Sequence, residues 1–257
     1  MNYAEKTLKK DKSPTIFEDL LESRLPEEEK CPERIAQESM TVVVAGTHGT
    51  AFAIATGIYY LLASPTTLQK LKTELREALP SPEQRYSWKD IDKLPYLKGV
   101  IQEALRLSYG SSARLPRVSP VDVLTVTDDA RGKTWNIPPG TPIGMSSLQI
   151  HHDETIFPNS NTFEPERWIG NPGLDRYMVS FTKGSRGCLG INLAYALMYL
   201  TVAHLFRVYG SKDYREQGDK GYLELYKTEF EDVEVAIDGF LPLSRNGSHG
   251  LQLIVKK

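Results

Sequence analysis

The sequence has few cysteines and no recognisable export signal. Its 257 residues include only two cysteines, Cys31 and Cys188, which are too few for a disulfide framework. The first residues, Met1 to Lys12, are polar and lysine-rich, with no apolar core of signal-peptide type and no anchor. We therefore expect a reducing compartment and, for this chain by itself, a cytoplasmic location.

The composition also lacks a strong bias of charge. The 31 basic and 33 acidic side chains leave a formal net charge of -2, and 40% of the residues are hydrophobic. These proportions exclude a disordered chain, and the charge balance argues against a nucleic-acid partner. The sequence shows no internal repeat, and its length is sufficient for a sizeable core in one or two domains.

One apolar run is long enough to cross a membrane. Met40 to Ala63 is mostly apolar and is long enough for the ~20 residues that a spanning helix requires. The run also contains three glycines, a histidine and four threonines, and it has no flanking basic cluster. We expect a buried central helix, and a single membrane span is the alternative.

Proline positions and apolar spacing predict a mainly α chain with a minor β region. Leucines recur at helical spacing between Pro65 and Pro80, and prolines suit the first turn of two further helices. The predicted helices span 13–25, 32–63, 65–79, 95–107 and 191–206. The predicted strands span 121–127, 133–137 and 251–255, with a hairpin turn at 245–248 before the last strand.

The most informative segment is a glycine-rich loop around Cys188. The loop runs from Phe181 to Gly190 and opens directly into the helix predicted from Ile191. A helix N-terminus favours an anionic thiolate, and glycines let backbone N–H groups turn toward the sulfur. This arrangement suits a soft sulfur ligand held against a haem iron. The alternative is a buried structural cysteine.

The loop resembles the cysteine signature of the cytochrome P-450 superfamily, the haem-thiolate monooxygenases. The pattern Phe-x-x-Gly-x-Arg-x-Cys-x-Gly is matched at all five fixed positions, which include Gly184 and Gly190. The resemblance implies haem b (iron protoporphyrin IX), with Cys188 as the proximal iron ligand. It also implies that Phe181 packs beside the sulfur and that Arg186 pairs with a haem propionate.

Three further charged residues resemble a structural network of this family. Glu103 and Arg106 lie three residues apart in a Glu-x-x-Arg pattern, and Arg167 lies in a Pro-Glu-Arg segment. The resemblance implies that the three pair in a buried network behind the cysteine loop, since buried charge must be paired. We expect this role to be structural and not chemical.

The segment after Glu-x-x-Arg resembles the stretch that runs over the haem edge in the family. Arg117 matches an arginine that pairs with a propionate, and Ser111 to Ala113 would face the substrate. A surface arginine in a turn is the alternative for Arg117. The run His151 to Glu154 could suggest a metal site, but adjacent residues rarely converge on one ion, so we expect a structural part for it.

The long apolar helix resembles the family's oxygen-binding helix between Ala45 and Thr50. Ala45 and Gly46 match the motif, whereas His48 replaces the usual acid and Gly49 replaces the usual threonine. We interpret His48 and Thr50 as a proton relay in which an ordered water replaces the missing hydroxyl. Poor coupling of electron transfer to product, or a core helix of small residues, are the alternatives.

The matched motifs belong to the C-terminal half of the family's proteins. The resemblance covers about Ile16 to the end, so we expect residues 1–257 to form a single partial domain that lacks the N-terminal half and its membrane anchor. Other stretches resemble fungal members of the trichodiene-oxygenase type, which suggests terpenoid or other secondary metabolites. One such stretch runs from Phe17 to Ser23.

The resemblance implies insertion of one oxygen atom from dioxygen into a small apolar substrate. Electrons would come from an NADPH-dependent flavin reductase, and the full-length family resides on the cytoplasmic face of the endoplasmic reticulum membrane. Two alternatives stay open. One is a truncated remnant that folds poorly or binds haem without turnover, and the other is a membrane protein spanning once at Met40 to Ala63.

Overall fold

The computed structural model describes residues 15–81, 83 and 85–257. Contacts divide the chain into two units, residues 1–47 and 48–257, with the long helix α3 (Pro32–Ala63) passing from one to the other. The lysine-rich segment Met1 to Lys12 and the first two residues of the first predicted helix lie outside the described residues.

The first unit contains short helices whose starts follow from capping residues. Helix α2 (Ile16–Glu22) begins after Thr15, whose hydroxyl accepts from the backbone N–H of Glu18 while the Glu18 carboxylate accepts from the backbone of Thr15. A 3-10 turn, η1 (Glu27–Lys30), follows Pro26 directly. Pro32 then occupies the first turn of α3, as predicted from its missing N–H.

Helix α3 is buried only in its second half, which corrects the expectation of a helix buried throughout. Its buried residues all lie from Ala53 onward, whereas Met40, Val43 and Val44 are exposed. By length and composition, α3 and α8 (Ile191–Val208) are the two helices of the described part that could cross a membrane. The second half of α3 and one face of α8 pack into the core, which does not favour a single span over Met40 to Ala63.

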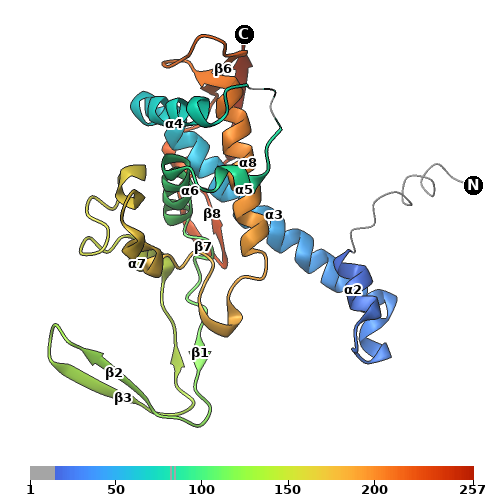
Figure 1. Ribbon diagram of the computed structural model, residues 1–257. Coiled ribbons are helices and arrows are strands. Elements are labelled where there is room, and N and C mark those ends of the chain that lie inside the picture. Colours follow the sequence, from blue (N-terminus) through green and yellow to red (C-terminus); the bar gives the residue numbers. More distant parts are fainter. Residues whose placement is uncertain (1–14, 82, 84) are drawn as a thin grey trace, which may run out of the picture. The chain divides into compact units, whose positions relative to one another are not determined.

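The core of the second unit is built by helices packed face to face (Figure 1). They are α4 (Pro65–Ala78), α5 (Trp88–Ile91), α6 (Pro95–Ser108) and α8. The predicted leucine stripe of α4 is buried at Leu68, Leu71 and Leu75, and Leu79 caps the helix. Hydrophobic burial in α4 and α6 therefore follows the periodicity that predicted them, whereas the short helix α5 was not predicted. The mainly α fold class is confirmed.

Four small sheets form the minor β region, and the described strands pair as follows. Strand β1 (Arg117–Val118) pairs with β4 (Pro142–Ile143), β2 (Leu124–Asp128) with β3 (Lys133–Ile137), β7 (Ile237–Gly239) with β8 (Leu241–Leu243), and β5 (Tyr209–Ser211), β6 (Gly221–Leu225) and β9 (Leu253–Lys256) form one sheet. The remaining elements are α7 (Ser147–His151), η2 (Pro165–Trp168), η3 (Pro172–Tyr177), η4 (Gly184–Arg186) and η5 (Phe230–Asp232).

Two strand predictions were wrong in detail. Strand β2 begins at Leu124 and not at residue 121, because Val121 and Val123 have no partner strand in the described part. A turn does form at 245–248, where the N–H of Ser248 donates to the carbonyl of Arg245. It joins no hairpin, because β8 pairs with β7 and β9 pairs with β6. Local turn chemistry predicted the turn but not the choice of partner strand.

A buried lysine, Lys72, connects α4 to the end of α8 and the residues that follow it. No pattern in the sequence predicted its burial. The Lys72 side chain is 1% exposed, and its Nζ lies 2.8 Å from Asp219 Oδ1. The same ammonium donates to the backbone carbonyls of Phe206 and Tyr209 at 2.7 and 3.0 Å. All three of its donors are therefore used, which is the condition under which a buried ammonium is tolerated.

The close approach of α6 to η2 depends on a glycine. A Cβ added to Gly99 would overlap the carbonyl oxygen of Pro165, whereas a Cβ on Gly46 of α3 would meet no atom within 4 Å. We predict that Gly99→Ala lowers the free energy of unfolding by about 2–3 kcal/mol through overpacking. Gly46→Ala should raise it by up to ~1 kcal/mol through helix propensity.

Urea unfolding of both variants and of the parent chain measures these two changes in the free energy of unfolding. Equal effects of the two substitutions would contradict the packing assigned to Gly99.

Candidate functional site

The carboxylate of Glu103 is the centre of a buried hydrogen-bond cluster. It is fully buried and accepts five hydrogen bonds. Arg106 donates two of them through Nε and Nη2, each at 2.8 Å. The other donors, at 2.8 to 3.0 Å, are Arg167 Nε, Trp168 Nε1 and the backbone N–H of Glu164. A carboxylate offers about four lone-pair sites, so this one is fully satisfied.

The guanidinium of Arg106 is satisfied as completely as its partner. Its remaining donors reach the backbone carbonyls of His151, Ser160 and Thr162 at 2.9, 2.6 and 3.1 Å. The structure thus brings together the three residues predicted to pair, Glu103, Arg106 and Arg167. Trp168 joins them although it was not predicted; its position next to Arg167 in the same segment was the available signal.

His151 links this cluster to the segment that leads into the cysteine loop. Its Nδ1 lies 2.9 Å from the carbonyl of Arg106, and its Nε2 accepts from the backbone N–H of Val179 at 3.2 Å. Burial lowers the pKa of His151 to about 4, so the ring is neutral near pH 7. Both ring nitrogens are used within the protein, in keeping with the structural part expected for this run.

The cysteine loop is closed by hydrogen bonds of its own backbone. The N–H of Cys188 donates to the carbonyl of Phe181 at 3.0 Å, and the N–H of Gly187 donates to that of Gly184. The Thr182 hydroxyl donates to the carbonyl of Arg186 at 3.2 Å. Gly184 has a φ of +79°, a conformation that favours glycine. The backbone conformation at this position therefore explains why the motif has a glycine at Gly184.

The loop presents the Cys188 thiol at the start of α8. All residues from 183 to 190 are exposed, Cys188 included, and α8 begins at Ile191. A Cβ on Gly190 would lie 4.0 Å from the sulfur, in ordinary contact. Phe181 packs its ring against Tyr195 of α8, with centroids 5.2 Å apart. An accessible thiol at the positive end of a helix dipole suits a soft anionic ligand.

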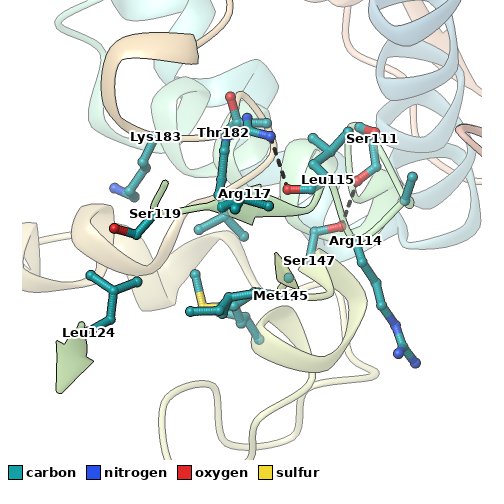
Figure 2. Close-up of a pocket in the computed structure, with 16 residues that line it drawn as sticks. Ser111, Arg114, Leu115, Arg117, Ser119, Leu124, Met145, Ser147, Thr182 and Lys183 are labelled. Atoms are coloured by element: carbon teal, nitrogen blue, oxygen red, sulfur yellow. Dashed lines mark hydrogen bonds between the residues drawn. The ribbon is translucent and has the colours of Figure 1, made fainter. Parts of the chain in front are cut away.

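A cavity of about 500 Å³ lies beside the loop (Figure 2). Thr182 and Lys183 of the loop line it, together with residues that follow α6 and residues around β4 and α7, such as Met145 and Ser147. Cys188 itself is not among the lining residues. The lining includes three cationic side chains and no carboxylate; the cations are Arg114, Arg117 and Lys183.

The two arginines predicted to hold a propionate are both exposed. Arg117 Nη1 donates to the carbonyls of Leu115 and Pro116 at 3.0 and 3.2 Å, which keeps the guanidinium at the cavity wall. Arg186 lies in the loop, and its side chain makes no hydrogen bond or ion pair with other described residues. In Figure 2 the Arg114 side chain extends away from the other labelled residues.

The predicted oxygen-binding helix segment lies in the middle of α3. Ala45 and Gly46 are exposed, and a Cβ added to Gly49 would meet no atom within 4 Å. His48 is half-buried, and its Nε2 lies 3.0 Å from the carbonyl of Pro242. The structure therefore leaves open space beside Gly49. The relay through His48 and Thr50 stays a prediction.

These residues fit the three parts of a haem group. An exposed thiol can ligate iron, cations without competing carboxylates can pair with propionates, and apolar side chains can cover the porphyrin plane. Near the thiol, Leu189 is 94% exposed and Leu193 is 61% exposed. Large apolar side chains exposed so close together in the sequence favour an apolar ligand or partner at this surface.

Comparison with known proteins identifies the family. The family description of cytochrome P-450 matches residues 1–224. The chain is 46% identical over 261 residues to the cytochrome P-450 monooxygenase astB of Talaromyces wortmannii, covering 99% of this chain and 52% of that protein. It is also 46% identical over 241 residues to the monooxygenase tpcC of Cochliobolus heterostrophus, covering 94% of this chain and 46% of that protein.

A solved structure supports the same fold. A cytochrome P-450 crystal structure superposes on 98% of this chain and 52% of its own, with a TM-score of 0.71 and 21% sequence identity. The chain therefore belongs to the cytochrome P-450 family. It spans about half the length of the curated relatives that it matches.

The Glu103 cluster yields a stability prediction. Glu103→Ala would leave two buried guanidinium groups and an indole N–H without their acceptor, so we expect a loss of about 3–5 kcal/mol in the free energy of unfolding. Urea unfolding measures it.

The matched control for Glu103→Ala is Glu164→Ala. The Glu164 carboxylate is 44% exposed and pairs with the same Arg167, so its removal should cost less than ~1 kcal/mol. A cost for Glu103→Ala as small as that of the control would refute the role of the cluster.

Proposed function

We propose that this chain is the haem-binding part of a haem-thiolate monooxygenase, with Cys188 as the proximal iron ligand. The observation that carries the proposal is the exposed Cys188 thiol, held at the start of α8 by a closed backbone loop. Haem, when bound, supplies the activation of dioxygen by which one oxygen atom enters an organic substrate. The protein supplies the thiolate, the position of the ligand and the exclusion of water.

The residues around Cys188 have separate tasks in this proposal. Arg117 at the cavity wall and Arg186 in the loop pair with the propionates, since planar guanidinium groups suit carboxylates. Phe181, packed on Tyr195, shields the sulfur from water on one side. Gly184 and Gly190 keep the loop close to the ligand plane, and the Glu103 cluster holds the layer behind it.

The family is the basis for the substrate class and the partner in this proposal. The matched relatives are fungal monooxygenases, which supports a small apolar secondary metabolite, such as a terpenoid, as the substrate. An NADPH-dependent flavin reductase is the proposed electron donor. In the whole protein, residues 1–257 contribute one part of a single domain, and the family's usual place is the cytoplasmic face of the endoplasmic reticulum membrane.

The two cysteines provide a matched test of the ligand. We predict that the haem-loaded, reduced chain with carbon monoxide gives a thiolate-type Soret band, and that Cys188→Ser abolishes it. Cys31→Ser should leave the band unchanged, because Cys31 does not belong to the loop that carries the cysteine motif. The measurement is the carbon monoxide difference spectrum of the three proteins.

A histidine-type band in the parent chain, or a thiolate band that survives in Cys188→Ser, would overturn the proposed ligand. Binding of haem with a thiolate band but no NADPH-dependent oxygen use would support the alternative of a haem binder without turnover.

The departure at Gly49 can be tested by restoring the usual residue. We predict that Gly49→Thr lowers peroxide release per NADPH consumed severalfold, because a hydroxyl at this position completes proton delivery. The substitution fits sterically, since no atom lies within 4 Å of the added Cβ. Peroxide and NADPH are measured with an added flavin reductase, and Gly49→Ala controls for the change in helix propensity. Equal peroxide release from the threonine and alanine variants would count against an impaired relay.

A further inference from the structure

The turn between β7 and β8 is unusually tight. Gly239 and Leu241 pair across it, so a single residue, Phe240, reverses the chain direction. Phe240 has a φ of +74°, which is a strained conformation for a bulky side chain, and its ring is 61% exposed. Strained backbone of this kind persists only where the surrounding structure holds it in place.

The hairpin cannot supply that support by itself. It has only two strands of three residues each, and an isolated pair of strands is marginally stable in water. Pro242 lies in the middle of β8 and has no N–H to donate to the ladder. Contacts from outside the hairpin must therefore hold the turn.

Two side chains from distant segments provide those contacts. The Ser111 hydroxyl, which follows α6, donates to the carbonyl of Phe240 at 3.0 Å. The Nε2 of His48 on α3 lies 3.0 Å from the carbonyl of Pro242, which can only accept. The His48 ring also stacks on Phe52 of α3, with centroids 6.2 Å apart and planes 15° from parallel. The imidazole thus has a fixed orientation and carries its proton on Nε2.

We propose that His48 is a positioning residue that ties the β7–β8 hairpin to α3. In doing so it fixes one wall of a cavity of about 390 Å³, lined by His48, Phe52, Ile237, Pro242 and Leu243 among others. The carbonyl of Pro242 needs a donor, not a base, so the ring acts here through its N–H. This deepens the proposed function and rests on it, because the cavity borders α3 at His48, within the segment that resembles the family's oxygen-binding helix.

The hairpin contact can be tested on the full chain without haem. Hydrogen exchange of a peptide covering residues 237–243 should become about tenfold faster in His48→Ala, because a hydrogen bond of ~1–1.5 kcal/mol is lost. His48→Gln should stay close to the parent, since its amide Nε2 can donate to Pro242 as the imidazole does. Exchange within α6 serves as the internal control and should be unchanged in both variants.

The ligand consequence is tested on the haem-loaded chain with two probes, imidazole and 4-phenylimidazole. The ratio of their spectrally measured affinities should change severalfold in His48→Ala and be kept in His48→Gln. The proposal that His48 holds the hairpin to α3 would be overturned if hydrogen exchange of residues 237–243 were unchanged in His48→Ala. It would also be overturned if exchange in His48→Gln were as fast as in His48→Ala. Faster exchange with an unchanged probe ratio would overturn the link to the ligand site. The exchange experiment needs no haem, so its result holds even if the proposed haem chemistry is wrong. A failure of the hairpin contact can therefore be told apart from a failure of the proposed function.

Discussion

The carboxylate of Glu103 is the interaction on which the rest of this structure depends. It lies fully buried in α6 and accepts five hydrogen bonds, from the side chains of Arg106, Arg167 and Trp168 and from the backbone of η2. An unpaired charge at such depth would be strongly destabilising, so the cluster tolerates no partial assembly. Its geometric requirements therefore fix α6 against η2 and the segment around 151–162.

This buried cluster determines where the cysteine loop begins. The backbone of Arg106 is bound by His151, and His151 accepts from the N–H of Val179 just before the loop. The Ser180 hydroxyl donates to the carbonyl of Leu105 at 2.9 Å, so α6 holds this segment at a second point. The loop from 183 to 190 is itself exposed and makes few side-chain contacts. A rigid support and an accessible ligand-bearing loop are the arrangement that metal ligation requires.

Much of this arrangement could be predicted from local patterns. Pro32 and Pro95 each begin a helix as expected, because proline lacks the N–H that the first turn does not need. The pairing of Glu103 with Arg106 follows from their spacing of three residues on one helix. The closed cysteine loop belongs to a motif in which Gly184 adopts a backbone conformation that favours glycine.

The remainder depends on contacts between distant segments, which periodicity does not report. The ion pair of Lys72 with Asp219 and the contact of His48 with Pro242 each join residues that no local pattern relates. The exposure of the first half of α3 likewise depends on which segments pack against it, and not on its own sequence pattern. The same holds for β9, whose partner is β6. Arg117 illustrates the point in the site itself. It was expected to pair with a propionate, which stays a prediction, and its bonds to the carbonyls of its own segment were not expected.

The central claim is that this support presents Cys188 as a thiolate ligand to haem iron. X-ray absorption at the iron edge of the haem-loaded chain tests it most directly, because it reports which atoms surround the metal. The account predicts one sulfur among the iron's nearest neighbours in the parent chain and in Cys31→Ser, and none in Cys188→Ser. A shell of nitrogen and oxygen alone in the parent chain, or a sulfur that persists without Cys188, would contradict it.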